Sequence, residues 1–172
     1  MRRLAVILCA SITATIGCGY TPVGYDEGFG DIRTIAIHTP ANDTYESGVE
    51  KIVADALRRE FLRRGAVRVV SNPSTADLVL DGSVRSVQVS SRSFSSVIFA
   101  LEYELVMVLD LEAVRADGTP LTVGKRSLQE SEFYLASADV EVMRKNREEA
   151  LRRVAGLLAQ RVHDSLFEAA AR

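Results

Sequence analysis

Three consecutive residues near the end of the chain, His163, Asp164 and Ser165, are the residue types of a hydrolytic triad. In such a triad the histidine takes a proton from the serine hydroxyl, and the carboxylate orients the imidazole ring. The apolar spacing around them predicts a helix, in which consecutive side chains point about 100° apart. The three side chains therefore cannot converge on one substrate, and we interpret them as a polar helix face.

The other candidates for catalysis or metal binding are weaker. His38 and His163 are the only histidines, and neither has the cysteine or histidine spacing of a zinc site. Four carboxylates share one face of a predicted strand, where they could form an acid–base pair but more typically mark the outward face of a half-buried strand. They are Glu102, Glu104, Asp110 and Glu112. We therefore expect no metal, no cofactor and no enzymatic activity.

Lipid attachment is the chemistry that the sequence does predict. Arg2 and Arg3 precede an apolar run from Leu4 to Ile16, which is the order of a secretory signal peptide and is too short to span a bilayer. The cysteine that follows, Cys18, resembles the lipidated cysteine of a bacterial lipobox. We expect a signal at residues 1–17 and a lipid on Cys18; the alternative is a plain secretory signal that happens to contain a cysteine.

The expected anchor places the chain in the cell envelope. Residues 18–31 are rich in glycine and have no helical or strand period, so we interpret them as a flexible tether to a domain at residues 32–172. Several acyl chains on Cys18 would hold the protein firmly to a membrane. An Asp directly after the lipidated cysteine resembles an inner-membrane retention signal. This chain has Gly19 at that position, which indicates the outer membrane.

Composition and charge are those of an ordinary folded domain. The 172 residues are 47% hydrophobic and 26% charged, which argues against disorder. The formal net charge of −2 becomes −4 when Arg2 and Arg3 leave with the signal, so we expect no nucleic-acid partner. The two cysteines, Cys9 and Cys18, leave no pair for a disulfide in the mature chain.

A strand and a helix are the first predicted elements of the domain. The strand covers residues 33–38, and a loop at residues 41–45 follows it. Ser47 and Glu50 stand at the spacing of a capping box, so we expect them to open the helix. Gly65 is placed to end it in the left-handed conformation.

Further strands follow the first helix. Residues 66–71 and 76–90 have strand patterns, with a bulge near Arg85 where the alternation changes phase. The Ser-rich residues 91–96 are predicted to be a loop. The clearest strand covers residues 102–113, in which every odd position is apolar.

A turn at residues 117–120 leads into the hairpin partner of that strand at residues 121–134, and a long helix covers residues 138–170. The strand–helix–strand start favours a parallel pair, whereas the hairpin is antiparallel. The sequence therefore predicts an α+β fold: a two-layer sandwich with a mixed four- to five-stranded sheet and two helices packed on one face.

Five blocks of sequence, taken in order, resemble the LptE family of lipopolysaccharide-assembly lipoproteins. They are Cys18-Gly19-Tyr20 and residues 34–37, 42–50, 56–61 and 76–84. The order and spacing of the blocks are more specific than any one block, and the resemblance covers nearly the whole mature chain. Leu121-Thr122-Val123 departs from the aromatic that many relatives have after the Asp-Gly turn.

The resemblance implies a binding role at the cell outer membrane. It implies an outer-membrane lipoprotein that plugs and helps assemble the LptD-type β-barrel and assists lipopolysaccharide export. Such a protein would lie on the periplasmic side or in the barrel lumen. The alternative is a free-standing periplasmic-facing lipoprotein that acts as a chaperone or an envelope-binding module without a barrel partner.

A protein that handles lipopolysaccharide needs cations near apolar surface, because the ligand carries phosphates on an acylated sugar base. Two places offer them. One is the loop with Arg92, Phe94, Val97, Ile98 and Phe99, and the other is the start of the last helix with Arg144, Lys145 and Arg147. The hypothesis is that Arg92 and Lys145, with Arg144 as a further candidate, contribute to binding; the alternative for each residue is a solvated basic patch.

Overall fold

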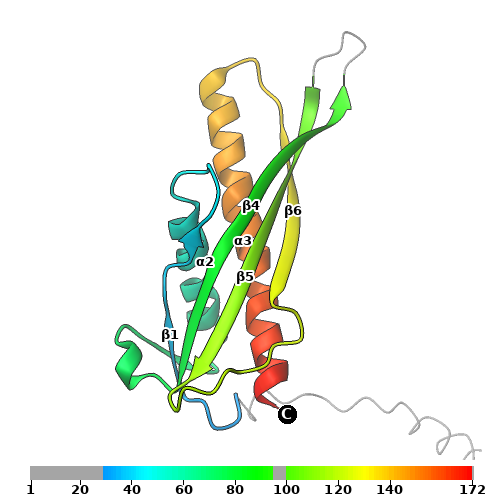
Figure 1. Ribbon diagram of the computed structural model, residues 1–172. Coiled ribbons are helices and arrows are strands. Elements are labelled where there is room, and N and C mark those ends of the chain that lie inside the picture. Colours follow the sequence, from blue (N-terminus) through cyan, green and yellow to red (C-terminus); the bar gives the residue numbers. More distant parts are fainter. Residues whose placement is uncertain (1–28, 95–99, 172) are drawn as a thin grey trace, which may run out of the picture.

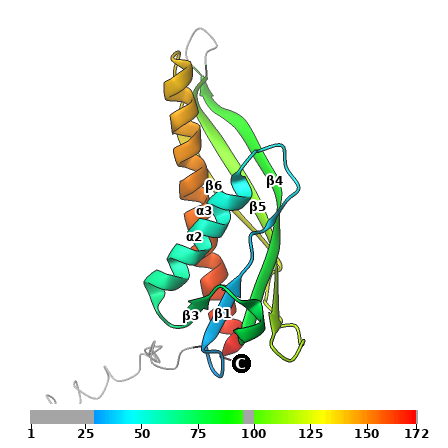
Figure 2. The same ribbon diagram turned by 90° about the vertical axis from the view of Figure 1, so that its left-hand side faces the viewer.

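A mixed sheet of six strands forms one layer of the structure and two helices form the other (Figure 1). The computed structural model describes residues 29–94 and 100–171. Figure 2 shows both helices on the same side of the sheet. The strands are β1 (Thr34–Ile37), β2 (Ala41–Asn42), β3 (Arg68–Val70), β4 (Leu78–Phe94), β5 (Ala100–Arg115) and β6 (Ser127–Leu135); the helices are α2 (Val49–Arg64), α3 (Val140–Ala170) and the short 3-10 helix η2 (Pro73–Thr75).

This architecture confirms the expected α+β fold, with more strands than the four to five that we predicted. The sheet order is β3-β1-β4-β5-β6, with β1 parallel to β3 and β4, and β5 antiparallel to β4 and β6. Strand β2 lies off this path and pairs with β4 opposite Ser83 and Val84. It falls in the expected loop because two residues are too few to show a strand period.

Strand β5 is the centre of the core. From Tyr103 to Ala113 its odd-numbered side chains face the helices, and Leu105, Met107 and Leu109 are fully buried. The even-numbered side chains lie on the face that the helices leave uncovered. This confirms the assignment of faces made from the alternation of apolar residues.

Strand β4 is longer than expected and carries the predicted bulge. Its register against β5 shifts between Val84 and Ser86, where the sequence alternation changes phase. The prediction of a loop from residue 91 is wrong for residues 91–94, which continue the strand. Serine has no strong strand preference of its own, and pairing with β5 decides the conformation, with Ser91 opposite Tyr103.

Helix α2 begins differently from the prediction and ends as predicted. Its N-cap is Gly48, with φ of 81° and no side-chain cap, so the capping box of Ser47 and Glu50 is wrong. The Glu50 carboxylate instead accepts a hydrogen bond from Asn42 Nδ2 at 3.0 Å. Gly65 ends the helix at φ 69° and donates its N–H to the Phe61 carbonyl at 3.1 Å.

Helix α3 begins at Val140, just after the predicted start. The Asp139 carboxylate caps it by accepting the N–H groups of Glu141 and Val142, at 2.8 and 3.1 Å. Its buried stripe packs on β5, β6 and α2. The fully buried members include Ala150, Val154, Leu158, Val162 and Leu166. Among the described helices, none combines the length and apolar composition needed to cross a membrane.

The residues before β1 belong to the packed domain. Phe29 and Ile32 are buried in the core, although Phe29 falls in the range that we assigned to the tether. Asp31 accepts two hydrogen bonds from the Arg115 guanidinium, at 2.8 and 2.9 Å, and these lower the pKa of its carboxyl group. The ordered domain therefore includes residues 29–31. The signal peptide and Cys18 lie outside the described residues, and their boundaries stay predictions.

Candidate functional site

The candidate ligand residues Arg92, Arg144 and Lys145 come from two elements. Arg92 lies near the C-terminal end of β4, and the other two lie near the start of α3. Figure 1 shows the end of β4 and the start of α3 toward the same end of the molecule. The candidates Val97, Ile98 and Phe99 lie outside the described residues.

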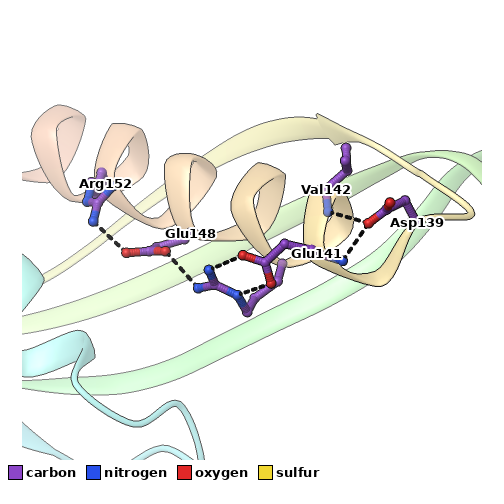
Figure 3. Close-up of polar contacts among 6 residues, drawn as sticks. Asp139, Glu141, Val142, Glu148 and Arg152 are labelled. Atoms are coloured by element: carbon purple, nitrogen blue, oxygen red, sulfur yellow. Dashed lines mark hydrogen bonds and ion pairs between the residues drawn. The ribbon is translucent and has the colours of Figure 1, made fainter.

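Arg144 is held by acidic neighbours on its own helix. Its guanidinium donates to both carboxylate oxygens of Glu141, at 2.6 and 3.0 Å, and to Glu148 at 3.2 Å. The hydrogen bond to Glu141 raises the pKa of Arg144 above its ordinary value. Figure 3 shows this chain of contacts, in which Glu148 also reaches Arg152. The positive charge of Arg144 is therefore largely balanced within the first turns of α3.

Lys145 and Arg147 differ in whether an acidic side chain pairs with them. Both Arg147 terminal nitrogens donate to the Glu46 carboxylate, one of them at 3.1 Å, which ties α3 to the loop before α2. Lys145 is exposed, and within residues 29–94 and 100–171 it has no hydrogen bond or ion pair. Two residues along a helix turn the side chain by about 200°, so Lys145 and Arg147 lie on nearly opposite sides. Lys145 is thus the cation here that is available to an outside anion.

Arg92 lies at the irregular end of the β4–β5 pairing. Its Nε is 3.4 Å from Glu104 Oε2, and its side chain is 56% exposed. Glu104 pairs with Phe133 of β6, which is itself 44% exposed. Arg92 therefore lies beside apolar surface, as the hypothesis requires, and is only weakly paired.

The polar residues of the hydrolytic-triad pattern do not form a site. His163 is buried, and its Nδ1 lies 3.3 Å from Oδ1 of the adjacent Asp164. Helix α3 turns Ser165 away from both, as helical geometry requires. Within the part of the chain that the structure describes, no group of three or more His, Cys, Asp or Glu residues is arranged to hold a metal ion.

The structure also shows a cleft that the sequence did not indicate. It has a volume of about 560 Å³ and is lined by residues 43–47 of the loop before α2, residues 85–87 at the β4 bulge, and Arg147 of α3. We call it the loop cleft. Its rim carries Tyr45, whose side chain is fully exposed. In the sequence, the one sign of this cleft was Tyr45, an aromatic residue in an otherwise polar loop, and the sequence does not show that its side chain is exposed.

A known family and several solved structures are similar to this chain. The family LptE, described as Lipopolysaccharide-assembly, matches residues 32–166. Comparison with curated proteins gave no match.

Three bacterial lipoproteins have similar structures. Uncharacterized lipoprotein B from Nitrosomonas europaea is 14% identical, with a TM-score of 0.54 over 81% of this chain and 83% of its own. Rare lipoprotein B from Shewanella oneidensis is 16% identical, with a TM-score of 0.52 over 78% and 93%. A minor lipoprotein from Acinetobacter baumannii is 14% identical, with a TM-score of 0.53 over 79% and 93%. At these identities the likeness shows a shared fold.

Proposed function

The chain belongs to the LptE family of lipopolysaccharide-assembly proteins, and we propose that it is a lipid-anchored outer-membrane protein that assists lipopolysaccharide export. In this proposal it plugs an LptD-type β-barrel, helps that barrel to assemble, and acts as a binding protein rather than an enzyme. The observation that carries the proposal is the family match over residues 32–166, which includes every strand and most of α3. In this proposal the membrane anchor is a lipid attached to Cys18.

The face of the sheet that the helices leave uncovered is partly polar, which supports the proposal of a partner with a polar surface. On β5 this face carries Glu104 and Asp110 with Val106 and Val108 between them, all half-buried. The interior wall of a membrane β-barrel is polar, whereas its outer wall is apolar. A mixed polar face of this kind is therefore compatible with a position inside a barrel lumen. The alternative, a free-standing envelope-binding module, would leave the same face in water.

For lipopolysaccharide itself, we propose Arg92 and Lys145 as phosphate contacts, with Arg144 secondary because Glu141 and Glu148 already occupy it. The test is the double variant Arg92→Glu and Lys145→Glu. We expect it to bind lipopolysaccharide at least tenfold more weakly, since charge-assisted hydrogen bonds to phosphate are replaced by repulsion. Binding is measured with the purified chain by displacement of a fluorescent lipopolysaccharide.

A matched control is Lys51→Glu and Arg59→Glu, a pair of exposed cations on α2 that has the same charge change. It should bind as the unaltered chain does, and both double variants should keep the melting temperature. Equal affinity in the two double variants would remove Arg92 and Lys145 from the binding site.

A further inference from the structure

We propose that the loop cleft is a binding site for an uncharged saccharide. The cleft is lined by residues 43–47, residues 85–87 and Arg147. It is distinct from the proposed phosphate contacts, because neither Arg92 nor Lys145 lines it. Its braced wall, its exposed aromatic ring, its balance of charge and its polar lining each support this ligand class.

The loop that forms one wall is braced before any ligand arrives. The Asn42 amide oxygen accepts the N–H of Thr44 at 2.9 Å, and the Asn42 amide nitrogen donates to the Glu46 carbonyl at 2.8 Å. Thr44 Oγ1 accepts the N–H of Glu46 at 3.0 Å. The Asp43 N–H donates to the Val84 carbonyl on β4 at 3.0 Å, which fixes the loop to the sheet. A wall ordered in this way loses little conformational entropy when it binds.

Tyr45 stands at the rim of this braced loop with its ring fully exposed. Within residues 29–94 and 100–171, no packing contact explains an aromatic side chain at this position, since its ring is fully exposed. A tyrosine ring offers a flat apolar face with a polar hydroxyl at its edge. A sugar ring has the matching character, an apolar face of C–H groups surrounded by hydroxyls.

The charges inside the cleft are already balanced. Arg85 pairs with Asp43 at 3.0 Å and with Asp110 at 3.2 Å, and Arg147 pairs with Glu46. A phosphate would meet the carboxylates of Asp43 and Glu46, and an ammonium group would meet the guanidinium groups of Arg85 and Arg147, so either ion is repelled by a like charge beside its partner. A neutral ligand can instead hydrogen-bond to the outer lone pairs and N–H groups that the pairs leave exposed.

The remaining lining also suits hydroxyl groups better than hydrocarbon. Ser47 and Ser86 present hydroxyls that have no hydrogen bond to any residue in the described part of the chain. Val87, half-buried, is the aliphatic side chain in the lining. Ligand sites for apolar molecules are lined mainly by hydrophobic side chains. An acyl chain is therefore a poor fit, and a hydroxyl-rich ligand is a good one.

Two envelope saccharides contain neutral sugar rings that fit this chemistry: the sugar portion of lipopolysaccharide and the glycan strand of peptidoglycan. The choice of these two rests on the proposed function, which places the chain in the envelope. The site itself rests on the geometry of the cleft. The two sources differ in their sugars, so separate probes distinguish them.

The test uses the full chain purified in lauryl dimethylamine oxide, because detergents with sugar headgroups would compete. One probe is the core oligosaccharide of lipopolysaccharide, freed of lipid by mild acid, dephosphorylated and with its carboxyl groups reduced to alcohols; the other is peptide-free glycan strands whose carboxyl groups are reduced in the same way. Saturation-transfer NMR and titration give the contacts and the Kd. We expect one probe to bind, and Tyr45→Ala to weaken its binding at least tenfold. The matched control Leu62→Ala removes another exposed apolar side chain, on α2, and should bind as the unaltered chain does.

Tyr45→Trp provides an independent readout, since the sequence has no tryptophan. This variant should keep the affinity, and its fluorescence should change on addition of the bound saccharide. The proposal is overturned if neither probe binds, if Tyr45→Ala binds as tightly as the unaltered chain, or if the tryptophan fluorescence does not respond. These results leave the proposed function standing, provided that tagged Tyr45→Ala still isolates the barrel partner.

Discussion

His163 is the residue whose environment most constrains its chemistry. It is buried against the rings of Phe29 and Phe61, with ring centroids 5.3 and 5.2 Å away. Its Nε2 has no hydrogen-bond partner within the described residues. Burial lowers the pKa of the imidazole, opposed by the hydrogen bond to Asp164 and reinforced by the positive charge of Arg64. The neutral ring is therefore the form that the folded domain prefers.

This preference predicts that the domain loses stability in mild acid. The unfolded chain protonates His163 near pH 6.5, and the folded chain does so only at lower pH. The contribution of the neutral His163 to the free energy of unfolding is fully present above the unfolded pKa. It falls as the pH drops toward the folded pKa, with a slope of at most about 1.4 kcal/mol per pH unit. Urea unfolding at pH 5.0 to 7.5 measures it. His163→Leu should flatten this dependence; an unchanged slope in that variant would contradict the assignment to His163.

Leu109 and Val108 are neighbours on β5 that face opposite sides of the sheet. Leu109 is fully buried under the helices, whereas Val108 lies half-buried on the uncovered face. Leu109→Ala should therefore cost roughly 2–5 kcal/mol of unfolding free energy, because it leaves a cavity in the core. Val108→Ala should cost clearly less. Chemical denaturation compares the two, and similar costs would refute the assigned faces.

At the scale of elements, a close approach between β4 and β5 depends on Gly82. A Cβ at this position would be driven against the backbone carbonyl of Asp110, nearer than real contacts allow. The strands cannot separate there without loss of pairing, since Gly82 lies directly opposite Leu111. Gly82→Ala should therefore destabilise the domain by roughly 1–3 kcal/mol.

Gly156 in α3 is the matched control, because a Cβ there meets nothing within 4 Å. Gly156→Ala should raise the stability by roughly 0.5–1 kcal/mol, as expected for an open position inside a helix. Thermal denaturation of both variants tests the pair. A Gly82→Ala chain as stable as the unaltered one would show that β4 and β5 can shift apart freely.

The sequence predicted elements whose signal is local and periodic. The alternation in β5, the phase change at the β4 bulge and Gly65 after α2 each express one local preference, and the structure confirms all three. The capping box at Ser47 failed because Asn42, eight residues away from Glu50, offers that carboxylate a different partner. Strand pairing also extended β4 into the Ser-rich residues 91–94.

The candidate site was less predictable for the same reason. Positive charge near apolar residues suggested Arg92, Arg144 and Lys145, but the partners that distinguish them are set by the folded surface. Glu141 and Glu148 could be suspected from helical spacing, whereas the contact of Arg92 with Glu104 depends on strand register. The loop cleft joins the loop before α2, the β4 bulge and α3. Only the tertiary fold brings these three segments together.

At the scale of the whole molecule, the start of the domain and the proposed ligand contacts lie at opposite ends. Gly30 lies so close to the Ala170 carbonyl that a Cβ would come within 2.9 Å of it, which places the entry of the chain at the end of α3. Figure 1 shows the start of α3 and the end of β4 at the far end. The described part of the chain therefore begins at the end of the molecule that lies opposite to Arg92 and Lys145.

The proposed role of this chain is that of the lipoprotein partner of an outer-membrane β-barrel. The most direct measurement is affinity isolation of the tagged full chain from mildly solubilised outer membranes of the source cells, followed by mass spectrometry. We expect a large LptD-type β-barrel to co-isolate with it in near-equal amount. Recovery of the tagged chain without such a barrel, from membranes in which the barrel is present, would contradict the proposed barrel partner and favour the free-standing lipoprotein.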